Sequence, residues 1–497
     1  MTDEKLAVEI GKAVKAKGGR TFYVGGVNRN RFLRKFGYSC AESDKDIDLE
    51  IYFIDKQTLI NILSRFGEID FVGKSFGIFK LKHSNLDIAL PRRETPAKIL
   101  HDKQTILVPN PLLPEEELEI KNRYPAYEIA VSPSTVFGHK DFLVVSDPFM
   151  SFKEAAERRD FTMNSIMVDV LSDEVVDPFN GVRDIKNRLI RATNPKAFVE
   201  DSLRVYRAIQ FSARLNFRIE ENTKRLCQQV DLSSLPKERV YAELEKLLMK
   251  SEKPSIGLRH MEELGILRYH PLLKTMVDCP QEPTHHPEGS VWNHTLMVVD
   301  EAAKRKHESK NPLAFMWAAL LHDIGKPATT QKSEQGKITS YGHDKAGGKL
   351  AVEYLKTLTD NKKLLSEVKA LVEHHMKPIL FHRVKDSIKD GAFRRLATKV
   401  DLRELILLSA CDQMGRGGVD RKKELEGINW FKRRCENLHV LEEKPTPIVT
   451  GKLLLSLGFM PGPQMGEIIR TSYDLQLDKG WGKDELIRFV LETYKAP

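Results

Sequence analysis

The chain has 497 residues, of which 41% are hydrophobic and 30% are charged, and its formal net charge is +9. This composition is ordinary for a soluble globular protein, and the length predicts more than one domain. No run of eighteen apolar residues occurs, so we expect no transmembrane helix and no membrane partner. The positive net charge favours a polyanionic partner such as nucleic acid.

The cysteines and the first residues predict a cytoplasmic location. The opening Met-Thr-Asp-Glu-Lys does not have the pattern of a signal peptide. The cysteines are scattered without C-x-x-C spacing, so we expect reduced thiols. They are Cys40, Cys227, Cys279, Cys411 and Cys435.

Helical and strand patterns alternate along the first part of the chain. The predicted elements are a helix over 6–17, strands over 22–24, 46–53, 71–81 and 86–90, a helix starting in 154–160 and a strand over 166–170. Proline-rich, polar sequence over 97–146 breaks this rhythm and predicts a mobile insertion between strands. From about residue 198 onward the apolar spacing is helical.

Two neighbouring motifs in the first fifty residues predict a nucleotidyl-transfer site. A predicted strand runs into Gly25 and Gly26 and then into Arg29, an arrangement that brings backbone N–H groups close to a triphosphate. Asp46 and Asp48 alternate on the next strand, so both carboxylates share one face and suit Mg²⁺. An isolated Gly-Gly usually marks a turn, and an isolated Asp-x-Asp usually marks a solvated strand end. Their order and short spacing favour a joint role, with the two aspartates as catalytic metal ligands.

These motifs resemble the nucleotidyltransferase superfamily of DNA polymerase beta. They resemble more closely the bacterial tRNA nucleotidyltransferases (CCA-adding enzymes) and poly(A) polymerases. The family pattern is Gly-Gly-x-x-Arg-Asp followed by Asp-x-Asp, and Asn30 stands here where the family has Asp. Asp87 is a candidate third carboxylate, or simply the end of a strand. Arg92-Arg93-Glu94 follows at once, as in the family, and the resemblance implies that Arg93 binds nucleotide.

Later motifs extend the resemblance into the neck. Residues 158–165, Arg-Arg-Asp-Phe-Thr-Met-Asn-Ser, are similar to a family segment that couples the head to the neck. The resemblance implies that Asp201 and Arg204 read the incoming base, with Arg207 beside them. A carboxylate can accept from the exocyclic amine of CTP or ATP, and UTP and GTP have a carbonyl oxygen at the corresponding ring position. The alternative for Asp201 and Arg204 is a solvated ion pair on a helix.

Histidines and aspartates in the second half of the chain predict a metal site. The candidate ligands are His294, His322, Asp323, His343, His374 and Asp412. Imidazole and carboxylate groups together suit a divalent cation, and a His-Asp pair that ends an apolar helix resembles the HD-type phosphohydrolases. A single buried histidine is more often a hydrogen-bonded core residue, but the whole series is present here. Spacing does not decide between His374 and His375, and Lys326 is placed to stabilise phosphate charge.

The resemblance implies an α+β fold: a polymerase-beta-like head with a mixed sheet, then an all-α neck and body and an all-α HD domain. The implied divisions are a head over 1–195, an RNA-binding neck over 196–280, an HD phosphohydrolase over 281–430 and a basic helical tail over 431–497.

The expected activity is template-independent addition of C and A residues to the tRNA 3′ end from CTP and ATP. Mg²⁺ is expected at the head, and a divalent metal of unassigned identity at an HD site that hydrolyses phosphoesters. Three alternatives remain: a CC-adding, A-adding or poly(A) polymerase relative, an HD nucleotide phosphohydrolase with an inactive head, and a non-catalytic RNA-binding protein. The sequence carries no signal for an oligomeric state.

Overall fold

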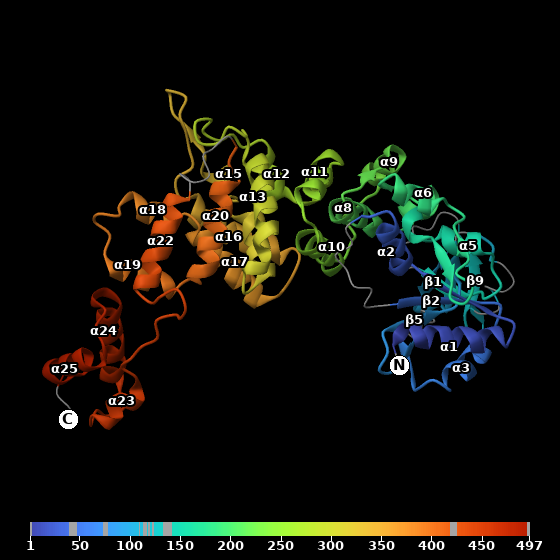
Figure 1. Cartoon of the computed structure of the whole chain (residues 1–497), viewed down its shortest axis with the longest axis horizontal. Helices are drawn as coiled ribbons and strands as arrows, with labels where there is room; N and C mark the ends of the chain where they lie inside the picture. The colour runs from blue at the N-terminus through green and yellow to red at the C-terminus, as the bar shows by residue number, and fades with distance from the viewer. Residues whose placement is uncertain are drawn as a thin grey trace. The chain divides into compact units, whose positions relative to one another are not determined.

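The structure, a computed structural model, describes residues 2–38, 47–72, 78–108, 110–112, 117, 120–121, 124–132, 142–417 and 425–494. These residues fall into two compact units, 1–243 and 244–497, a coarser division than the four parts expected from the sequence. Figure 1 shows strands and helices mixed in the first unit and helices dominating the second. The predicted α+β head followed by all-α regions is therefore confirmed.

A seven-stranded mixed sheet forms the centre of the first unit. Its order is β12-β11-β1-β2-β5-β4-β3, and neighbouring strands are antiparallel except β2 and β5. The strands are β1 (Arg20–Val24), β2 (Ile47–Tyr52), β3 (Ile69–Val72), β4 (Ile78–Leu81), β5 (Leu86–Ala89), β11 (Met167–Asp169) and β12 (Val175–Val176). The single strand predicted over 71–81 is wrong, because the chain reverses there and β3 and β4 pair antiparallel.

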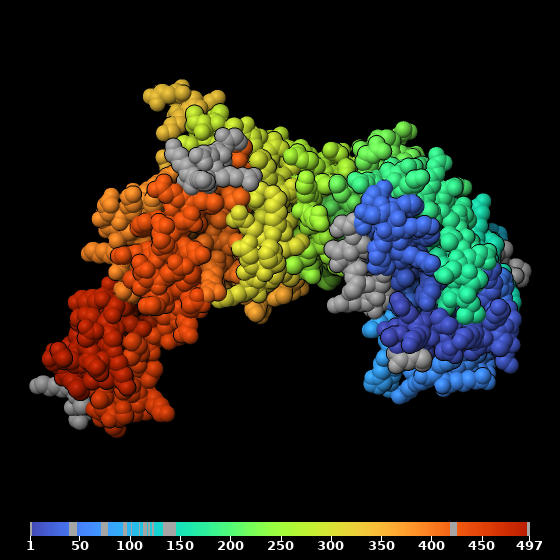
Figure 2. Space-filling view, viewed as in Figure 1, coloured from blue at the N-terminus to red at the C-terminus, as the bar shows by residue number. Residues whose placement is uncertain are grey.

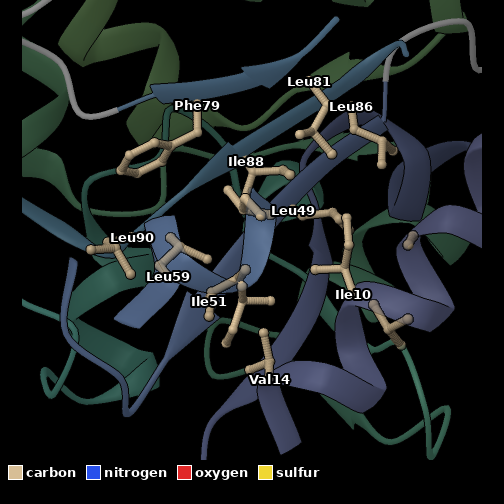
Figure 3. Close-up of a cluster of buried hydrophobic side chains, with 14 of the residues drawn as sticks. Ile10, Val14, Leu49, Ile51, Leu59, Phe79, Leu81, Leu86, Ile88 and Leu90 are labelled. Atoms are coloured by element: carbon tan, nitrogen blue, oxygen red, sulfur yellow. The ribbon is translucent and has the colours of Figure 1, made fainter. Parts of the chain in front are cut away.

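Strand β2 has one apolar face and one polar face, because side chains alternate along a strand. Leu49 and Ile51 enter a buried hydrophobic cluster, where Figure 3 shows them beside Ile10 and Val14. Two helices contribute to this cluster, α1 (Asp3–Lys15) and α3 (Lys56–Leu63). Asp48, Glu50 and Tyr52 therefore lie on the opposite face of the sheet.

The insertion has a β-structure of its own within the part that the structure describes. β6 (Arg92–Pro96) pairs with β10 (Phe142–Ser146). A separate sheet consists of β7 (Lys98–Leu100), β8 (Thr105–Val108) and β9 (Glu128–Val131). Ile106 and Val108 are fully buried in a small apolar cluster, and this alternation on β8 is the signal that the sequence analysis missed.

Short helices complete the first unit. They are α2 (Gly26–Lys35), α5 (Phe152–Glu157), α6 (Gly181–Lys186), α7 (Pro195–Glu200), α8 (Leu203–Leu215) and α9 (Glu221–Gln229), and α10 (Lys237–Lys250) crosses into the second unit. Ser151 and Glu154 form a capping box at the start of α5. This cap fixes where the helix begins. Arg158 and Arg159 follow at the C-terminal end of the helix.

An apolar helix, α14 (Pro312–Leu321), is the centre of the second unit, and its residues from Ala314 onward are all buried. It packs against α13 (Val291–Arg305), α17 (Lys362–His374) and α20 (Leu402–Met414). The other helices are α11 (Ser255–Glu263), α12 (Pro271–Val277), α15 (Lys326–Thr329), α16 (His343–Lys356), α18 (Lys377–Arg383), α19 (Asp390–Ala397) and α22 (Glu426–Asn437). His322 and Asp323 follow α14 directly, so the central helix carries them into the interior.

The C-terminal helices have their own apolar core. They are α23 (Gly451–Ser456), α24 (Pro463–Lys479) and α25 (Lys483–Thr493), and their side chains fill a continuous lobe drawn in red in Figure 2. Arg395 of α19 forms ion pairs with Asp474 (3.0 Å) and Asp478 (2.7 Å) of α24. No helix in the described ranges has the length and apolar character needed to cross a membrane.

A buried histidine outside the metal-ligand candidates makes the second unit sensitive to acid. His270 is 4% exposed, and its Nδ1 lies 3.1 Å from the hydroxyl of Tyr354. Burial lowers the pKa of His270 to about 4, whereas an unfolded chain keeps the usual value near 6.5. Between these two values the unfolded state binds a proton that the native state does not, so acid lowers the free energy of unfolding.

We predict that His270 alone lowers the free energy of unfolding by about 2 kcal/mol between pH 7 and pH 5. In His270→Gln, urea denaturation should show a correspondingly smaller difference between the two pH values. The exposed His307→Gln is the control and should keep the wild-type difference. An unchanged pH dependence in His270→Gln would contradict the assignment.

Candidate functional site

The turn between β1 and α2 brings Gly25 close to Asp48 and Arg159. Gly25 has φ of 72°, a left-handed conformation that favours glycine. A Cβ atom at Gly25 would lie 3.0 Å from Oδ2 of Asp48 and 3.7 Å from Nη1 of Arg159. Gly25 is therefore required both by its backbone angle and by the close approach of a carboxylate.

The pairing of the central strands places a second carboxylate next to Asp48. Asp48 lies opposite Val24 of β1 and in register with Asp87 of the parallel strand β5. Residues in register on neighbouring strands share a face, so Asp48 and Asp87 face the same side of the sheet. Asp87 also forms an ion pair with Lys80 at 2.7 Å. Asp46, predicted as the partner of Asp48, lies outside the described residues.

A buried polar network connects α2 to α8. The guanidinium of Arg29 donates to the amide oxygens of Asn30 (3.0 and 3.2 Å) and Asn164 (3.0 Å). Asn164 donates to Asp160 (2.9 Å), and Asp160 accepts from Arg207 (2.7 Å). Asn30, which replaces the family aspartate, thus holds Arg29 through a neutral oxygen.

The charges within this network depend on each other. Burial alone would raise the pKa of Asp160, but Arg207 and Asn164 lower it below its usual value. The negative charge of Asp160 in turn raises the pKa of Arg207. An ionised pair at this position links the head segment that begins with Arg158 to helix α8.

The predicted base-reading pair is not a direct ion pair. Arg204 donates to the backbone carbonyls of Ala197 and Arg158, at 2.6 Å each. Asp201 lies 3.5 Å from Arg239 instead. The two carbonyls fix the plane of the Arg204 guanidinium. Arg93 lies on β6, and its side chain is outside what the structure describes.

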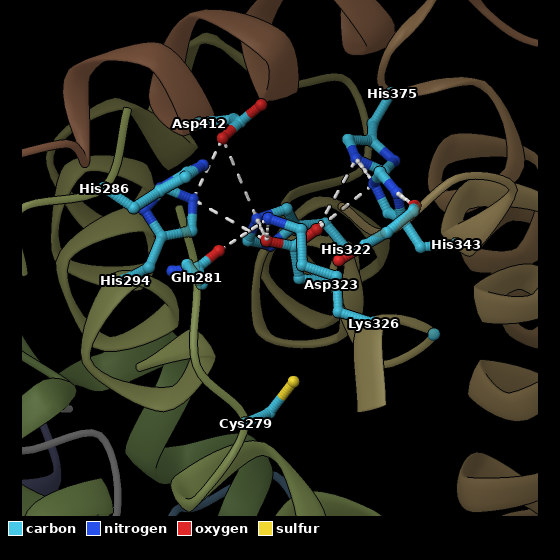
Figure 4. A network of polar contacts seen from close by, with 12 residues as sticks. Cys279, Gln281, His286, His294, His322, Asp323, Lys326, His343, His375 and Asp412 are labelled. Carbon is cyan, nitrogen blue, oxygen red and sulfur yellow. Dashed lines mark hydrogen bonds and ion pairs between the residues drawn. The ribbon is translucent and has the colours of Figure 1, made fainter. Parts of the chain in front are cut away.

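A histidine and aspartate cluster lies inside the second unit, as Figure 4 shows. Its members come from different helices or helix ends and are all at most 9% exposed: His294, His322, Asp323, His343, His375 and Asp412. The distances between ligand atoms allow a metal ion at His286, Glu288 and His294, and also at two groups within this cluster. The groups are His294, His322 and Asp412 on one side and Asp323, His343 and His375 on the other.

Asp323 lies between the two groups. Its Oδ2 is 3.2 Å from Nε2 of His322, and its Oδ1 is 3.4 Å from Nε2 of His343 and 3.8 Å from Nε2 of His375. Burial alone would raise the pKa of Asp323, but Lys326 and His322 keep it well below its usual range. The carboxylate is therefore ionised, and each of its oxygens faces a different group.

Backbone carbonyls orient the imidazole rings. The Nδ1 atoms of His322, His343 and His375 lie 2.9, 2.7 and 2.8 Å from the carbonyls of residues 319, 340 and 372. A carbonyl can only accept, so each Nδ1 carries a proton, and in a neutral ring Nε2 then presents a lone pair. The Nε2 atoms of His343 and His375 then face each other at 3.3 Å. Two facing lone pairs repel each other unless a proton or a metal ion lies between or beside them.

Other atoms of the cluster fit a cation as well. Nε2 of His322 is buried, and it makes no well-formed hydrogen bond among the described residues although Oδ2 of Asp323 lies 3.2 Å away. Nε2 of His294 faces Oδ1 of Asp412 at 3.0 Å, a contact that requires a proton or a metal ion. The residues present therefore suit a divalent metal, and the mixture of nitrogen and oxygen ligands is typical of transition metals.

The structure brings His375 into the cluster and leaves His374 out of both groups. His375 lies three, four and seven residues after Val372, Leu371 and Val368, which are all buried on α17. Helical periodicity therefore places His375 on the buried face, a signal that was present in the sequence.

Glu288 also lies beside the cluster and was not among the residues predicted from the sequence. Its Oε1 lies 2.9 Å from Nδ1 of both His286 and His294, and its Oε2 accepts from the backbone N–H of Gly417 at 3.1 Å. Glu288 thus connects the segment before α13 to the end of α20. Lys326, which the sequence did indicate, lies 2.7 Å from Oδ2 of Asp323.

Comparisons with known proteins match the two parts of the chain in which these residues lie. The chain matches the family model of the poly A polymerase head domain over residues 21–191 and that of the HD domain over 291–416. It also matches the model described as a probable RNA and SrmB-binding site of polymerase A over 216–276.

Named relatives decide the family. The chain is 35% identical over 299 residues to the multifunctional CCA protein of Stenotrophomonas maltophilia, which covers 57% of this chain and 70% of that relative. It is 31% identical over 350 residues to the protein of the same name from Xanthomonas campestris, covering 67% and 80%. The chain belongs to the family of multifunctional CCA proteins.

Solved structures show the fold of this multifunctional CCA family member. The Bacillus stearothermophilus CCA-adding enzyme in complex with CTP has a TM-score of 0.59 at 18% identity, with 99% of this chain and 98% of that chain covered. The Thermotoga maritima CCA-adding enzyme in complex with tRNA has a TM-score of 0.56 at 18% identity, with 99% and 95% covered.

Proposed function

We propose that this chain adds C and A residues to the 3′ end of tRNA, using CTP and ATP without a nucleic-acid template. The convergence of Gly25, Asp48 and Arg159 is the observation that carries the proposal. It combines an open helix N-terminus, a metal-binding carboxylate and a guanidinium at one position, as nucleotidyl transfer requires. The family relationship supports the same activity.

The chemistry at the head follows from positioning and charge. The N-terminus of α2, at Gly26, presents backbone N–H groups that receive the triphosphate. Asp46 and Asp48 would hold Mg²⁺, which would neutralise negative charge on the attacking 3′ oxygen and the leaving pyrophosphate. Asp87, in register beside Asp48, is a third candidate ligand. Arg29, which is buried, binds the triphosphate through its positive charge.

Selection of the base is assigned to α8 and the residues before it. Asp201 accepts from the exocyclic amine of CTP or ATP, and Arg204 donates to ring acceptors. The two carbonyls that hold Arg204 favour this role, because a guanidinium of fixed plane loses less entropy when a base binds. Arg93 and Arg207 complete the nucleotide-binding set, and Arg207 acts through its ion pair with Asp160.

The partner is the tRNA 3′ end, and the net charge of +9 favours phosphate contacts that weaken with salt. The cytoplasmic location expected from the sequence remains a prediction.

A second activity is assigned to the HD cluster. We propose phosphoester hydrolysis, with 2′,3′-cyclic phosphates on damaged RNA ends as the substrate class. The residues that would hold the metal are His294, His322, Asp323, His343, His375 and Asp412. A divalent transition metal bound there would activate water for attack on phosphorus. Lys326, close to Asp323, stabilises phosphate charge.

The first test of this cluster compares two adjacent histidines. We expect His375→Ala to lower the affinity for Mn²⁺ at least about tenfold, because a ligand of the second group is lost. His374→Ala is the matched control and should bind Mn²⁺ as the wild type does. Isothermal titration of the metal-free protein measures both. Loss of Mn²⁺ binding in His374→Ala alone would contradict the assignment.

The two activities should separate by mutation. Asp48→Asn should lower incorporation of labelled CTP and ATP into tRNA at least about a hundredfold and leave hydrolysis of a cyclic phosphate unchanged. Asp323→Asn should have the opposite pattern. The exposed Asp70→Asn and Asp386→Asn are controls for the first and second units. Full incorporation by Asp48→Asn would refute the head assignment.

The alternatives give different results in these assays. A specialised relative would stop after two C residues or add only A. An HD phosphohydrolase with an inactive head would hydrolyse the cyclic phosphate and incorporate nothing. A non-catalytic RNA-binding protein would bind tRNA and do neither.

A further inference from the structure

The polar face of β2 carries a carboxylate that the proposed chemistry does not use. Glu50 follows Asp48 by two residues and therefore lies on the same face of the strand. It is 1% exposed, which is unusual for a glutamate. Because an isolated buried charge is costly, its partners must account for its position.

Two consecutive arginines and a tyrosine surround Glu50. Oε1 of Glu50 accepts from Nη2 of Arg158 at 2.7 Å, and Oε2 lies 3.5 Å from Nη2 of Arg159. The hydroxyl of Tyr52, two residues further along β2, donates to Oε2 at 2.8 Å. Burial alone would raise the pKa of Glu50, but the two arginines lower it, so the carboxylate is charged.

The arginines have donors that the protein does not use. The Nε atoms of Arg158 and Arg159 are buried and have no hydrogen-bond partner among the described residues. Nη1 of Arg159 lies next to the position that a Cβ of Gly25 would occupy, and Asp48 lies there too. The guanidinium of Arg159 is thus held at the end of β1, where the incoming nucleotide is assigned.

Glu50 also neutralises charge at this position. Two adjacent guanidinium groups repel each other, and the single carboxylate between them reduces that repulsion. A charge-assisted bond fixes a guanidinium in a defined plane.

We propose that Glu50 is a positioning residue for nucleotidyl transfer: it holds the Arg158–Arg159 pair in the orientation that binds the incoming nucleoside triphosphate. Glu50 does not touch the nucleotide itself. This inference rests on the assignment of the head as a nucleotidyltransferase.

Glu50→Gln tests the proposal, because it removes the charge and keeps the shape. We expect the KM for both CTP and ATP to rise about tenfold, as the loss of a charge-assisted bond implies. The kcat at saturating nucleotide and the KM for tRNA should stay within about twofold of wild type. Partial unfolding would lower kcat in proportion to the inactive fraction and leave KM unchanged, so the two effects are distinguishable.

A double-mutant cycle shows whether Glu50 acts through the arginines. In an Arg158→Gln, Arg159→Gln background, Glu50→Gln should no longer change the KM for either nucleotide. Asp169→Asn is the matched control, because Asp169 is also a buried acid paired with an arginine, Arg20, on the same sheet. It should leave the KM for nucleotides unchanged.

Tyr52→Phe is the second test variant if Glu50→Gln does not fold, because it removes the hydroxyl that donates to Glu50. It should raise the KM for nucleotides in the same direction by a smaller factor. An unchanged KM for CTP and ATP in the folded variant would overturn the inference. If the wild type incorporates no nucleotide, the proposed function itself fails, which is a different result.

Discussion

The alternation of side chains along β2 is the constraint on which the head depends. Leu49 and Ile51 must face the apolar cluster under α1 and α3, so Asp48 and Glu50 must face the other way. A shift of one residue would bury the carboxylates in the core and expose the apolar side chains. The hydrophobic core therefore fixes the register that brings Asp48 to Gly25, and core stability and site geometry have the same origin.

In the second unit, the packing of helices determines where the site residues lie. The apolar helix α14 is buried from Ala314 onward, and its C-terminal end places His322 and Asp323 in the interior. Carbonyls close to His322, His343 and His375 accept hydrogen bonds from the Nδ1 atoms, so the Nε2 atoms face Asp323. Each ring is oriented by a contact from within three residues, and the packing of the helices then brings the rings together.

Local patterns predicted the parts of the site that depend on neighbouring residues. Gly25 and Asp48 could be identified because a turn and an alternating strand are short-range features. The choice of His375 over His374 was also present in the helical period of α17. The meeting of Glu50 with Arg158 was not predictable, because these residues are far apart in the sequence and only the folded sheet joins them. The β-structure of the insertion was missed because its short strands are separated by proline-rich sequence.

The central claim is that the polar face of β2 supports the addition of nucleotides to tRNA. The most direct measurement is incorporation of labelled CTP and ATP, with Mg²⁺, into a tRNA transcript that lacks its 3′ CCA, followed by sequencing of the product end. The account predicts three added residues, C, C and A, when both nucleotides are present. A transcript that gains no nucleotide under these conditions would contradict it.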